Sequence, residues 1–187
     1  MDSLDCARQR IRAFIAGSMV PEDPQHAENT LQWLLRLRPD AGPALQLAAL
    51  AHDIERARPD RYRREQFDHY DSFKAAHAER GARLLREILQ ACEVDESIAA
   101  EACRLVRLHE TGGDADADSL CDADSLSYFD INLPLYYQRE GPAETLRRCR
   151  WGLQRLSPDA RPWLAQLQHH PPHLRHLIQQ AMAETSR

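Results

Sequence analysis

The sequence contains no long apolar segment and no excess of basic residues. None of its stretches approaches the ~20 consecutive apolar residues of a membrane-spanning helix. Residues 1–17 mix acids with arginines, whereas a signal peptide places basic residues before an apolar core. The net charge of −5 over 187 residues disfavours binding to a nucleic-acid duplex, because proteins that bind one carry a basic face. We therefore expect a cytoplasmic protein that contacts neither membranes nor duplex nucleic acid.

Cysteine is present but follows no pattern typical of metal sites or disulfide-rich folds. No two cysteines form a C-x-x-C pair, and an odd, scattered set is not a disulfide framework. The five residues are Cys6, Cys92, Cys103, Cys121 and Cys149. We interpret them as reduced thiols that are partly buried in helices.

The alternation of apolar and polar residues that predicts strands is also lacking. Apolar residues instead recur at three- and four-residue spacing, which predicts helices. Prolines and the paired glycines at 112 and 113 mark helix boundaries. The predicted helices cover approximately residues 4–15, 23–38, 43–56, 72–92, 95–109, 120–131, 142–156, 162–168 and 172–184, and an acidic loop is predicted at 114–118. We expect one all-α domain, a helical bundle that spans residues 1–187.

The polar segment 57–71 interrupts the helical pattern and predicts a long loop or irregular arm. Its aromatic residues either form a lid that stacks on a nucleobase or pack the arm onto the bundle, and the sequence leaves both open. These residues are Tyr62, Phe67, His69 and Tyr70.

His52 and Asp53 are the first candidate metal ligands. Adjacent helical side chains point about 100° apart, so both reach one ion only if it lies close against the helix. Alanines at 48, 49 and 51 leave room for that approach. An imidazole beside a carboxylate suits Mn, Fe, Co, Ni or Zn better than calcium. The dipeptide alone is common and carries little weight.

Two further residues give the dipeptide a context. His26 lies in the first turn of the preceding predicted helix, and Asp124 lies at the start of a much later one. The order H…HD…D, with each part on its own helix, resembles the HD-domain superfamily of metal-dependent phosphohydrolases over about residues 20–131. The resemblance implies that His26, His52, Asp53 and Asp124 hold one metal ion. Asp124 matches better than Asp122, because it precedes an apolar leucine by two residues. The rest of the chain, 132–187, is expected to pack on this core as a helical extension.

His77 and His109 extend the pattern to H…HD…H…H…D. This order is similar to the two-metal YqeK-like subgroup, which has a comparable H-x-x-x-G-A segment and hydrolyses dinucleoside tetraphosphates. The resemblance implies that both histidines bind a second ion and that Asp53 bridges the pair. Glu110 departs from the subgroup's histidine-threonine-glycine sequence, and the arm at 57–71 is longer and more aromatic. These departures leave the substrate open.

The resemblance implies hydrolysis of a nucleotide or another small phosphorylated metabolite through metal-activated water. The implied ions are one or two divalent cations, with Mn, Fe, Co, Ni, Zn or Mg as candidates. Asp53, Glu55 and Arg56 are the candidate catalytic residues, with Glu55 as a ligand-orienting group or proton relay and Arg56 facing the phosphate. Spacing along the helices adds candidate substrate-binding residues, which are Lys74, Arg80 and Tyr70.

Two other functions fit the same residues. Similar di-iron HD proteins are oxygenases, and a non-catalytic nucleotide-binding regulator would keep the fold without turnover. The sequence does not decide between a monomer and a homodimer. Two other clusters, the histidines at 169–176 and the arginines at 147, 148 and 150, are interpreted as solvated surface groups.

Overall fold

The computed structural model describes residues 2–167 and 170–185, and within these ranges the chain is all-α, as the sequence predicts. Its α-helices are α1 (Ser3–Ile15), α2 (Asp23–Leu37), α3 (Pro43–Ala51), α4 (Tyr70–Ala91), α5 (Glu96–Leu108), α6 (Ala115–Ser127), α7 (Leu133–Arg155) and α8 (Pro172–Thr185). Short helical turns are η1 (Ile54–Ala57), η2 (Arg64–Gln66), η3 (Tyr128–Asn132) and η4 (Arg161–Gln166), of which η3 is a π-turn and the others are 3₁₀. None of the helices in these ranges is both long and apolar enough to span a membrane.

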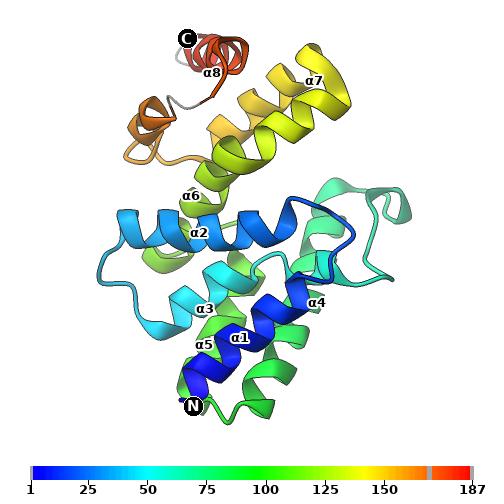
Figure 1. Cartoon of the computed structure of the whole chain (residues 1–187), viewed down its shortest axis with the longest axis vertical. Coiled ribbons are helices and arrows are strands. Elements are labelled where there is room, and N and C mark those ends of the chain that lie inside the picture. Colours follow the sequence, from blue (N-terminus) through cyan, green and yellow to red (C-terminus); the bar gives the residue numbers. More distant parts are fainter. Residues whose placement is uncertain (1, 168–169, 186–187) are drawn as a thin grey trace.

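The C-terminal part of helix α3 is fully buried. Its residues Leu47 to Ala51 are at most 1% exposed, and α1, α2, α5 and α6 all contact it (Figure 1). Three alanines in this stretch let the neighbouring helices approach closely, so the end of α3 lies deep in the bundle. His52 and Asp53, which follow directly, are therefore held in the interior.

The C-terminal half begins where α6 runs through η3 into α7. Helix α7 is kinked at Gly141, whose φ of 79° and ψ of 177° turn the chain back on itself (Figure 1). A positive φ of this size favours glycine, because a Cβ atom would strain the backbone. Trp33 of α2 lies edge-on to Trp163 of η4 at 6.0 Å between ring centroids. One hydrophobic cluster extends from Ala7 in α1 to Ala181 in α8.

Several predicted boundaries are wrong. The acidic segment predicted as a loop is helical from Ala115, because Asp114 caps α6 by accepting hydrogen bonds from the main-chain nitrogens of Asp116 and Ala117. Residues 133–140, for which no helix was predicted, form the first part of α7. The predicted helix at 162–168 is a 3₁₀ segment that ends at Gln166. The third predicted helix ends at Ala51, and residues 54–57 form a separate turn.

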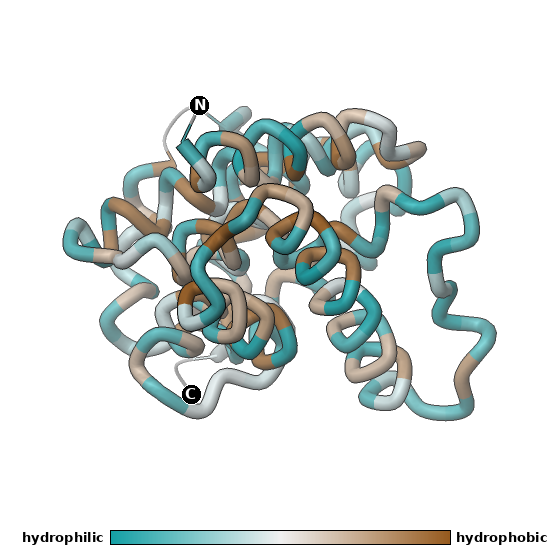
Figure 2. The backbone as a smooth tube through the Cα atoms, turned by 90° about the horizontal axis from the view of Figure 1, so that it is seen from below, coloured by the Kyte–Doolittle hydropathy of each residue, from teal (hydrophilic) through white to brown (hydrophobic). Residues whose placement is uncertain are grey.

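The arm at 57–71 leaves the bundle as an extended, mostly hydrophilic excursion that contains η2 (Figure 2). Tyr62 and Phe67 pack edge to face at 5.4 Å, and Phe67 contacts Phe73 of α4 at 5.7 Å. Arg80 of α4 reaches across to the Asp60 carboxylate and main-chain carbonyl. These contacts pack Phe67 onto α4, whereas Tyr62 and Tyr70 also line the cavity next to the candidate ligands, so the lid alternative stays open for these two.

Two surface expectations require correction. Cys6 of α1 and Cys92 at the end of α4 form a disulfide, so they are not reduced thiols; Cys103, Cys121 and Cys149 are free and buried. In the histidine cluster, His169 lies outside the described residues. His170 is buried and its Nε2 donates to the Phe129 carbonyl, so it is not a solvated group. His173 and His176 are exposed, as predicted, and His173 also contacts Tyr137.

Candidate metal centre

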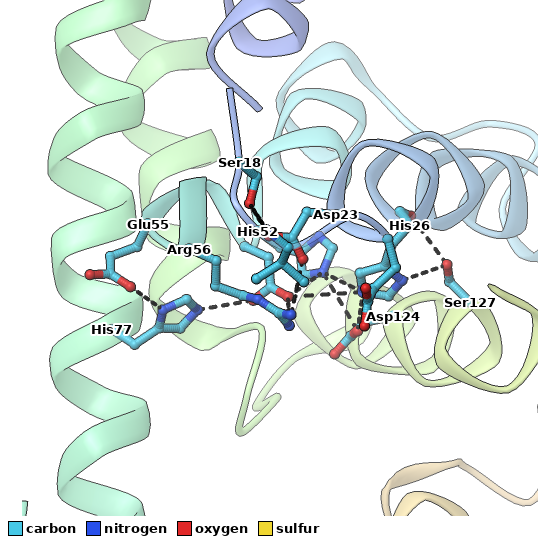
Figure 3. Close-up of polar contacts among 12 residues, drawn as sticks. Ser18, Asp23, His26, His52, Glu55, Arg56, His77, Asp124 and Ser127 are labelled. Atoms are coloured by element: carbon cyan, nitrogen blue, oxygen red, sulfur yellow. Dashed lines mark hydrogen bonds and ion pairs between the residues drawn. The ribbon is translucent and has the colours of Figure 1, made fainter. Parts of the chain in front are cut away.

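The six predicted ligands come together in one cluster. Figure 3 shows four of them, His26, His52, His77 and Asp124. α2 supplies His26, the end of α3 supplies His52 and Asp53, α4 supplies His77, the end of α5 supplies His109 and α6 supplies Asp124. Each imidazole is at most 4% exposed. Residues separated by up to 98 positions thus meet at one point, as the resemblance implied.

Asp53 lies between two pairs of histidines. Its Oδ1 is 2.9 Å from His77 Nε2 and 3.9 Å from His109 Nε2. Its Oδ2 is 3.9 Å from His26 Nε2 and 3.8 Å from His52 Nε2. The helix ends before Asp53, whose φ of −102° and ψ of 16° lie outside the helical range. The side chains of His52 and Asp53 therefore need not point about 100° apart, as adjacent side chains in a helix do.

We call His26 and His52 with Asp53 the first group, and His77 and His109 with Asp53 the second group. Asp124 completes the first group. Its Oδ1 lies 3.2 Å from His26 Nε2 and 3.5 Å from His52 Nε2, and the two Nε2 atoms are 3.2 Å apart. Two imidazole lone pairs directed at each other repel unless a proton or a cation lies between them. The first group therefore consists of two nitrogens and two carboxylates that converge on a point suited to a cation.

Two of the imidazoles are oriented by the ends of their own helices. The Nδ1 of His52 donates to the Ala49 carbonyl at 2.9 Å, and the Nδ1 of His109 donates to the Val106 carbonyl at 2.7 Å. Carbonyls in the last turn of a helix have no partner within the helix and can only accept. This fixes the proton on Nδ1 and leaves the Nε2 lone pair directed into the cluster.

The other two imidazoles reach the same state through side chains. His26 Nδ1 lies 2.8 Å from Ser127 Oγ, and that hydroxyl donates its own proton to the His26 carbonyl, so it accepts from Nδ1. His77 Nδ1 donates to Glu55 Oε2 at 2.9 Å. All four histidines thus present Nε2 to the cluster, which is the arrangement that metal-binding histidines usually have. The donor set fits one or two divalent ions.

Arginines flank both carboxylates. Arg56 lies 3.0 Å from Asp53 Oδ2 and 2.9 Å from Asp23 Oδ1, and Arg155 lies 3.0 Å from Asp124 Oδ2. Burial opposes ionisation of both aspartates, but Arg56 beside Asp53, Arg155 beside Asp124 and the imidazoles hold the pKa of each carboxyl well below its usual range. Both are therefore anionic, as ligands must be.

The histidines differ in their pKa. Burial opposes protonation, but the carboxylates of Asp53 and Asp124 outweigh it and raise the pKa of His52 to about 9. Asp53 and Glu55 outweigh burial in the same way and raise the pKa of His77 to about 9. Burial lowers the pKa of His109. Without a metal, His52 and His77 are therefore protonated at neutral pH, and their positive charge balances the nearby carboxylates. A bound divalent cation would balance the same carboxylates in place of these protons.

The predicted catalytic and substrate-binding residues have different positions. Glu55 is 0% exposed and orients His77 while accepting from the main-chain nitrogen of Tyr62, so it supports the cluster from behind. Lys74 pairs with Glu110 at 3.0 Å, and Arg80 pairs with Asp60. Neither Lys74 nor Arg80 is among the described residues that line the cavity next to the ligands.

That cavity has a volume of about 260 Å³ and opens over the candidate ligands. Tyr70 and Arg56 line it as predicted. Further lining residues come from the C-terminal half and were not singled out for this role, namely Tyr128, Arg148, Trp151 and Arg155. Arg148 had been interpreted as a solvated residue, but it lies over the Trp151 ring at 3.9 Å.

Sequence reasoning missed several residues of the site. Ser127 stands one helical turn after Asp124, so helical spacing gives a weak local signal for it. Glu110, noted only as a departure from the subgroup, places Oε1 at 3.8 Å from His109 Nε2. Arg155 also donates to the His109 carbonyl at 3.2 Å, and no pattern in the sequence connects it with Asp124.

Asp122, the rejected alternative to Asp124, lies elsewhere. Its carboxylate accepts hydrogen bonds from the main-chain nitrogen and the hydroxyl of Ser157, at 2.8 and 2.7 Å. Burial raises its pKa. It joins α6 to the segment after α7 and is not part of the cluster, which supports the choice of Asp124.

Comparison with known proteins gives one finding. Neither the curated proteins nor the solved structures contain a significant match to this chain. A family model described as a domain of unknown function, DUF4202, matches residues 5–178, which includes all six clustered residues. The chain therefore belongs to the DUF4202 family.

Proposed function

We propose that the chain is a divalent-metal-dependent phosphohydrolase of the HD type that acts on a nucleotide or another small phosphorylated metabolite. The observation that carries the proposal is the position of Asp53. One of its oxygens faces His77 and His109, and the other faces His26 and His52. A carboxylate shared in this way is suited to bridge two ions, which in hydrolases lie ~3.5–4 Å apart.

The chemistry of the residues supports hydrolysis by water and not by a protein nucleophile. Bound divalent ions would polarise a phosphoryl oxygen and lower the pKa of water. Burial raises the pKa of the Cys121 thiol to about 11, and this thiol donates to the His109 carbonyl. Burial likewise raises the pKa of Cys149 to about 12. Neither thiol is an activated nucleophile at neutral pH.

The remaining residues of the cavity are suited to an anionic, partly aromatic substrate. Arg56, Arg148 and Arg155 line it together with Tyr70 and Trp151. The arginines offer charge-assisted hydrogen bonds to phosphate oxygens, and the rings offer faces on which a base can stack. The carboxylates of Asp23 and Asp53 both bind the Arg56 guanidinium and so hold it beside the first group.

The test combines elemental analysis of untagged protein with a phosphatase screen in which Mg, Mn, Fe, Co, Ni and Zn are supplied in turn. We expect about two ions per chain and metal-dependent release of phosphate from nucleotides or sugar phosphates. The screen is repeated under nitrogen. Activity with Mg or Mn in the absence of oxygen excludes the di-iron oxygenase.

Two results would contradict the proposal. Phosphate release that is unchanged by a chelator would remove the role of the metal. Tight nucleotide binding by metal-loaded protein, with no product from any substrate in the screen, would favour the non-catalytic regulator instead.

A further inference from the structure

A second cavity adjoins the one over the metal ligands. Its volume is about 570 Å³. The two cavities have six lining residues in common, which are Arg56, Tyr70, Tyr128, Asn132, Arg148 and Trp151. They therefore form one groove, with the metal ligands at its inner end and residues of η2 and α7 at its outer end. The outer cavity is called the outer pocket below.

The kink in α7 forms this pocket. At Gly141 the helix turns back on itself (Figure 1). Arg139 before the kink and Arg147 and Arg148 after it therefore line the same pocket. The Tyr136 hydroxyl donates to Glu144 at 3.1 Å and joins the two arms of the helix. A straight helix would place these arginines along more than one turn of its surface and not around a hollow.

The charged side chains that line the outer pocket are Arg56, Arg64, Arg139, Arg147, Arg148 and, as the acid, Glu22. Three of the arginines have carboxylate partners. Arg56 pairs with Asp23 and Asp53, Arg139 with Glu22 and Glu140, and Arg147 with Glu144.

The other two arginines have neutral partners. Arg64 donates to the main-chain carbonyls of Phe67 and Asp68. Arg148 lies over the rings of Trp151 and Tyr128, at 3.9 and 5.3 Å from their centroids. Among the described residues, no carboxylate lies within ion-pair distance of Arg64 or Arg148. The outer pocket thus has two arginines without an ion pair among the described residues, and one of them, Arg148, lies over two aromatic rings. The Glu144 carboxylate lies near enough to Arg148 to interact with its charge but forms its ion pair with Arg147.

We propose that the outer pocket is a second anion-binding subsite, so that the substrate of the metal centre has at least one phosphate group beyond the one that is hydrolysed. The proposal rests on the proposed function for the identity of the reacting group. Arginine recognises phosphate oxygens through planar, paired hydrogen bonds, and the neutral partners of Arg64 and Arg148 leave their charge available. The continuous groove lets a single molecule occupy both cavities.

The experiment compares ligands that differ only in their second phosphate. Binding of AMP, ADP and adenosine 3′,5′-bisphosphate to the full-length, metal-loaded chain is measured by titration calorimetry, with free metal in excess over nucleotide. We expect at least one of the two doubly phosphorylated ligands to bind on the order of tenfold more tightly than AMP, because a charge-assisted hydrogen bond has about that effect. The preference should shrink at high salt, since the outer pocket is open.

Substitutions test whether the two arginines cause the preference. Arg64→Ala should reduce the preference while binding of AMP changes little, because Arg64 lines the outer pocket and not the cavity over the candidate ligands. Arg148 lines both cavities, so Arg148→Met should weaken binding of all three ligands and that of the doubly phosphorylated ones most, and the two substitutions together should bring the preference below about threefold. Arg148→Met keeps a long apolar side chain over Trp151, and thermal unfolding checks that both variants fold. Arg10→Ala is the matched control, because Arg10 is exposed on α1, away from the groove.

The outcomes separate this proposal from the proposed function. Equal affinities for the three ligands, or a preference that survives both substitutions, would overturn the second subsite even if the protein hydrolyses phosphate esters. A preference that depends on Arg64 and Arg148 in a protein without hydrolase activity would keep the subsite and overturn the proposed function.

Discussion

The two halves of the candidate metal centre share Asp53 but are built differently. The first group, His26, His52 and Asp124 with Asp53, has a second carboxylate of its own, and its imidazoles are oriented by neutral oxygens of Ser127 and Ala49. The second group, His77 and His109 with Asp53, has Glu110 Oε1 at 3.8 Å from His109 Nε2, but the Glu110 carboxylate is already paired with Lys74 and Arg155.

The second group also has a carboxylate behind one of its histidines. Glu55 accepts from the Nδ1 of His77 and makes that imidazole a stronger electron donor. From this difference we expect the first group to bind an ion more tightly, and the affinity of the second group to depend on Glu55. The following predictions test this contrast, beginning with the largest expected effect.

Asp53→Asn should abolish binding of both ions, because the shared carboxylate loses its charge in both groups. In the wild-type protein, metal at 100 times its dissociation constant should stabilise the fold by about 2.7 kcal/mol. We expect the variant to lack this stabilisation and to have no metal-dependent hydrolysis. Thermal unfolding with and without a chelator measures the first effect. A variant that retains its metals would show that Asp53 does not bridge the groups.

Asp124→Asn should remove the ion of the first group and leave that of the second. Elemental analysis should give about one ion per chain, and hydrolysis should fall by about 10²–10³-fold, as when a main electrostatic group is removed from an active site. Asp122→Asn is the matched control, since that carboxylate binds Ser157 and not the cluster. Equal losses in the two variants would assign the effect to the fold of α6.

His77→Ala should remove only the ion of the second group. We expect about one ion per chain, retained as tightly as the first ion of the wild-type protein, and a smaller loss of activity than in Asp124→Asn. Competition with a chromogenic chelator measures both stoichiometry and affinity. If the wild-type protein binds a single ion and the substitution leaves it unchanged, the centre is confined to His26, His52, Asp53 and Asp124.

Glu55→Gln should weaken metal binding in the second group by about 10–100-fold without a change in stoichiometry at saturating metal. Ser127→Ala should have a smaller effect on the first group, because a neutral hydroxyl contributes less to the basicity of His26 than a carboxylate does to that of His77. Metal titrations of the two variants in parallel give the comparison. A larger effect at Ser127 would reverse the proposed order of the two groups.

Arg80→Met should have the smallest effect. Arg80 joins α4 to the arm through Asp60, which is largely exposed, and its Nη1 also lies 3.4 Å from the buried Glu55 Oε1. Because Glu55 keeps its hydrogen bonds from His77 and Tyr62, the loss of stability should be about 1 kcal/mol. Metal content and activity should stay close to those of the wild-type protein, although the arm should become more sensitive to limited proteolysis. A strong rise in KM would return Arg80 to the substrate-binding residues.

Much of the fold was readable from local patterns. Three- and four-residue spacing located most helices, because burial of one helix face imposes that period directly on the sequence. Errors arose where a local device replaced the period, as at Asp114, which caps a helix inside an acidic run. Another arose at residues 133–140, where α7 proceeds directly from a π-turn without a boundary signal in the sequence.

The six candidate ligands were selected from the sequence by order and residue type, since the chemistry of a cation site restricts both. Only the tertiary structure decided what surrounds them. The Ser127 anchor of His26, the Arg155 contact with Asp124 and the position of Arg148 in the groove each depend on contacts between helices far apart in the chain. The same holds for the pairing of Cys6 with Cys92. Periodicity reports which face of a helix is buried, but not which distant side chain will lie against it, because that choice is made when the helices pack.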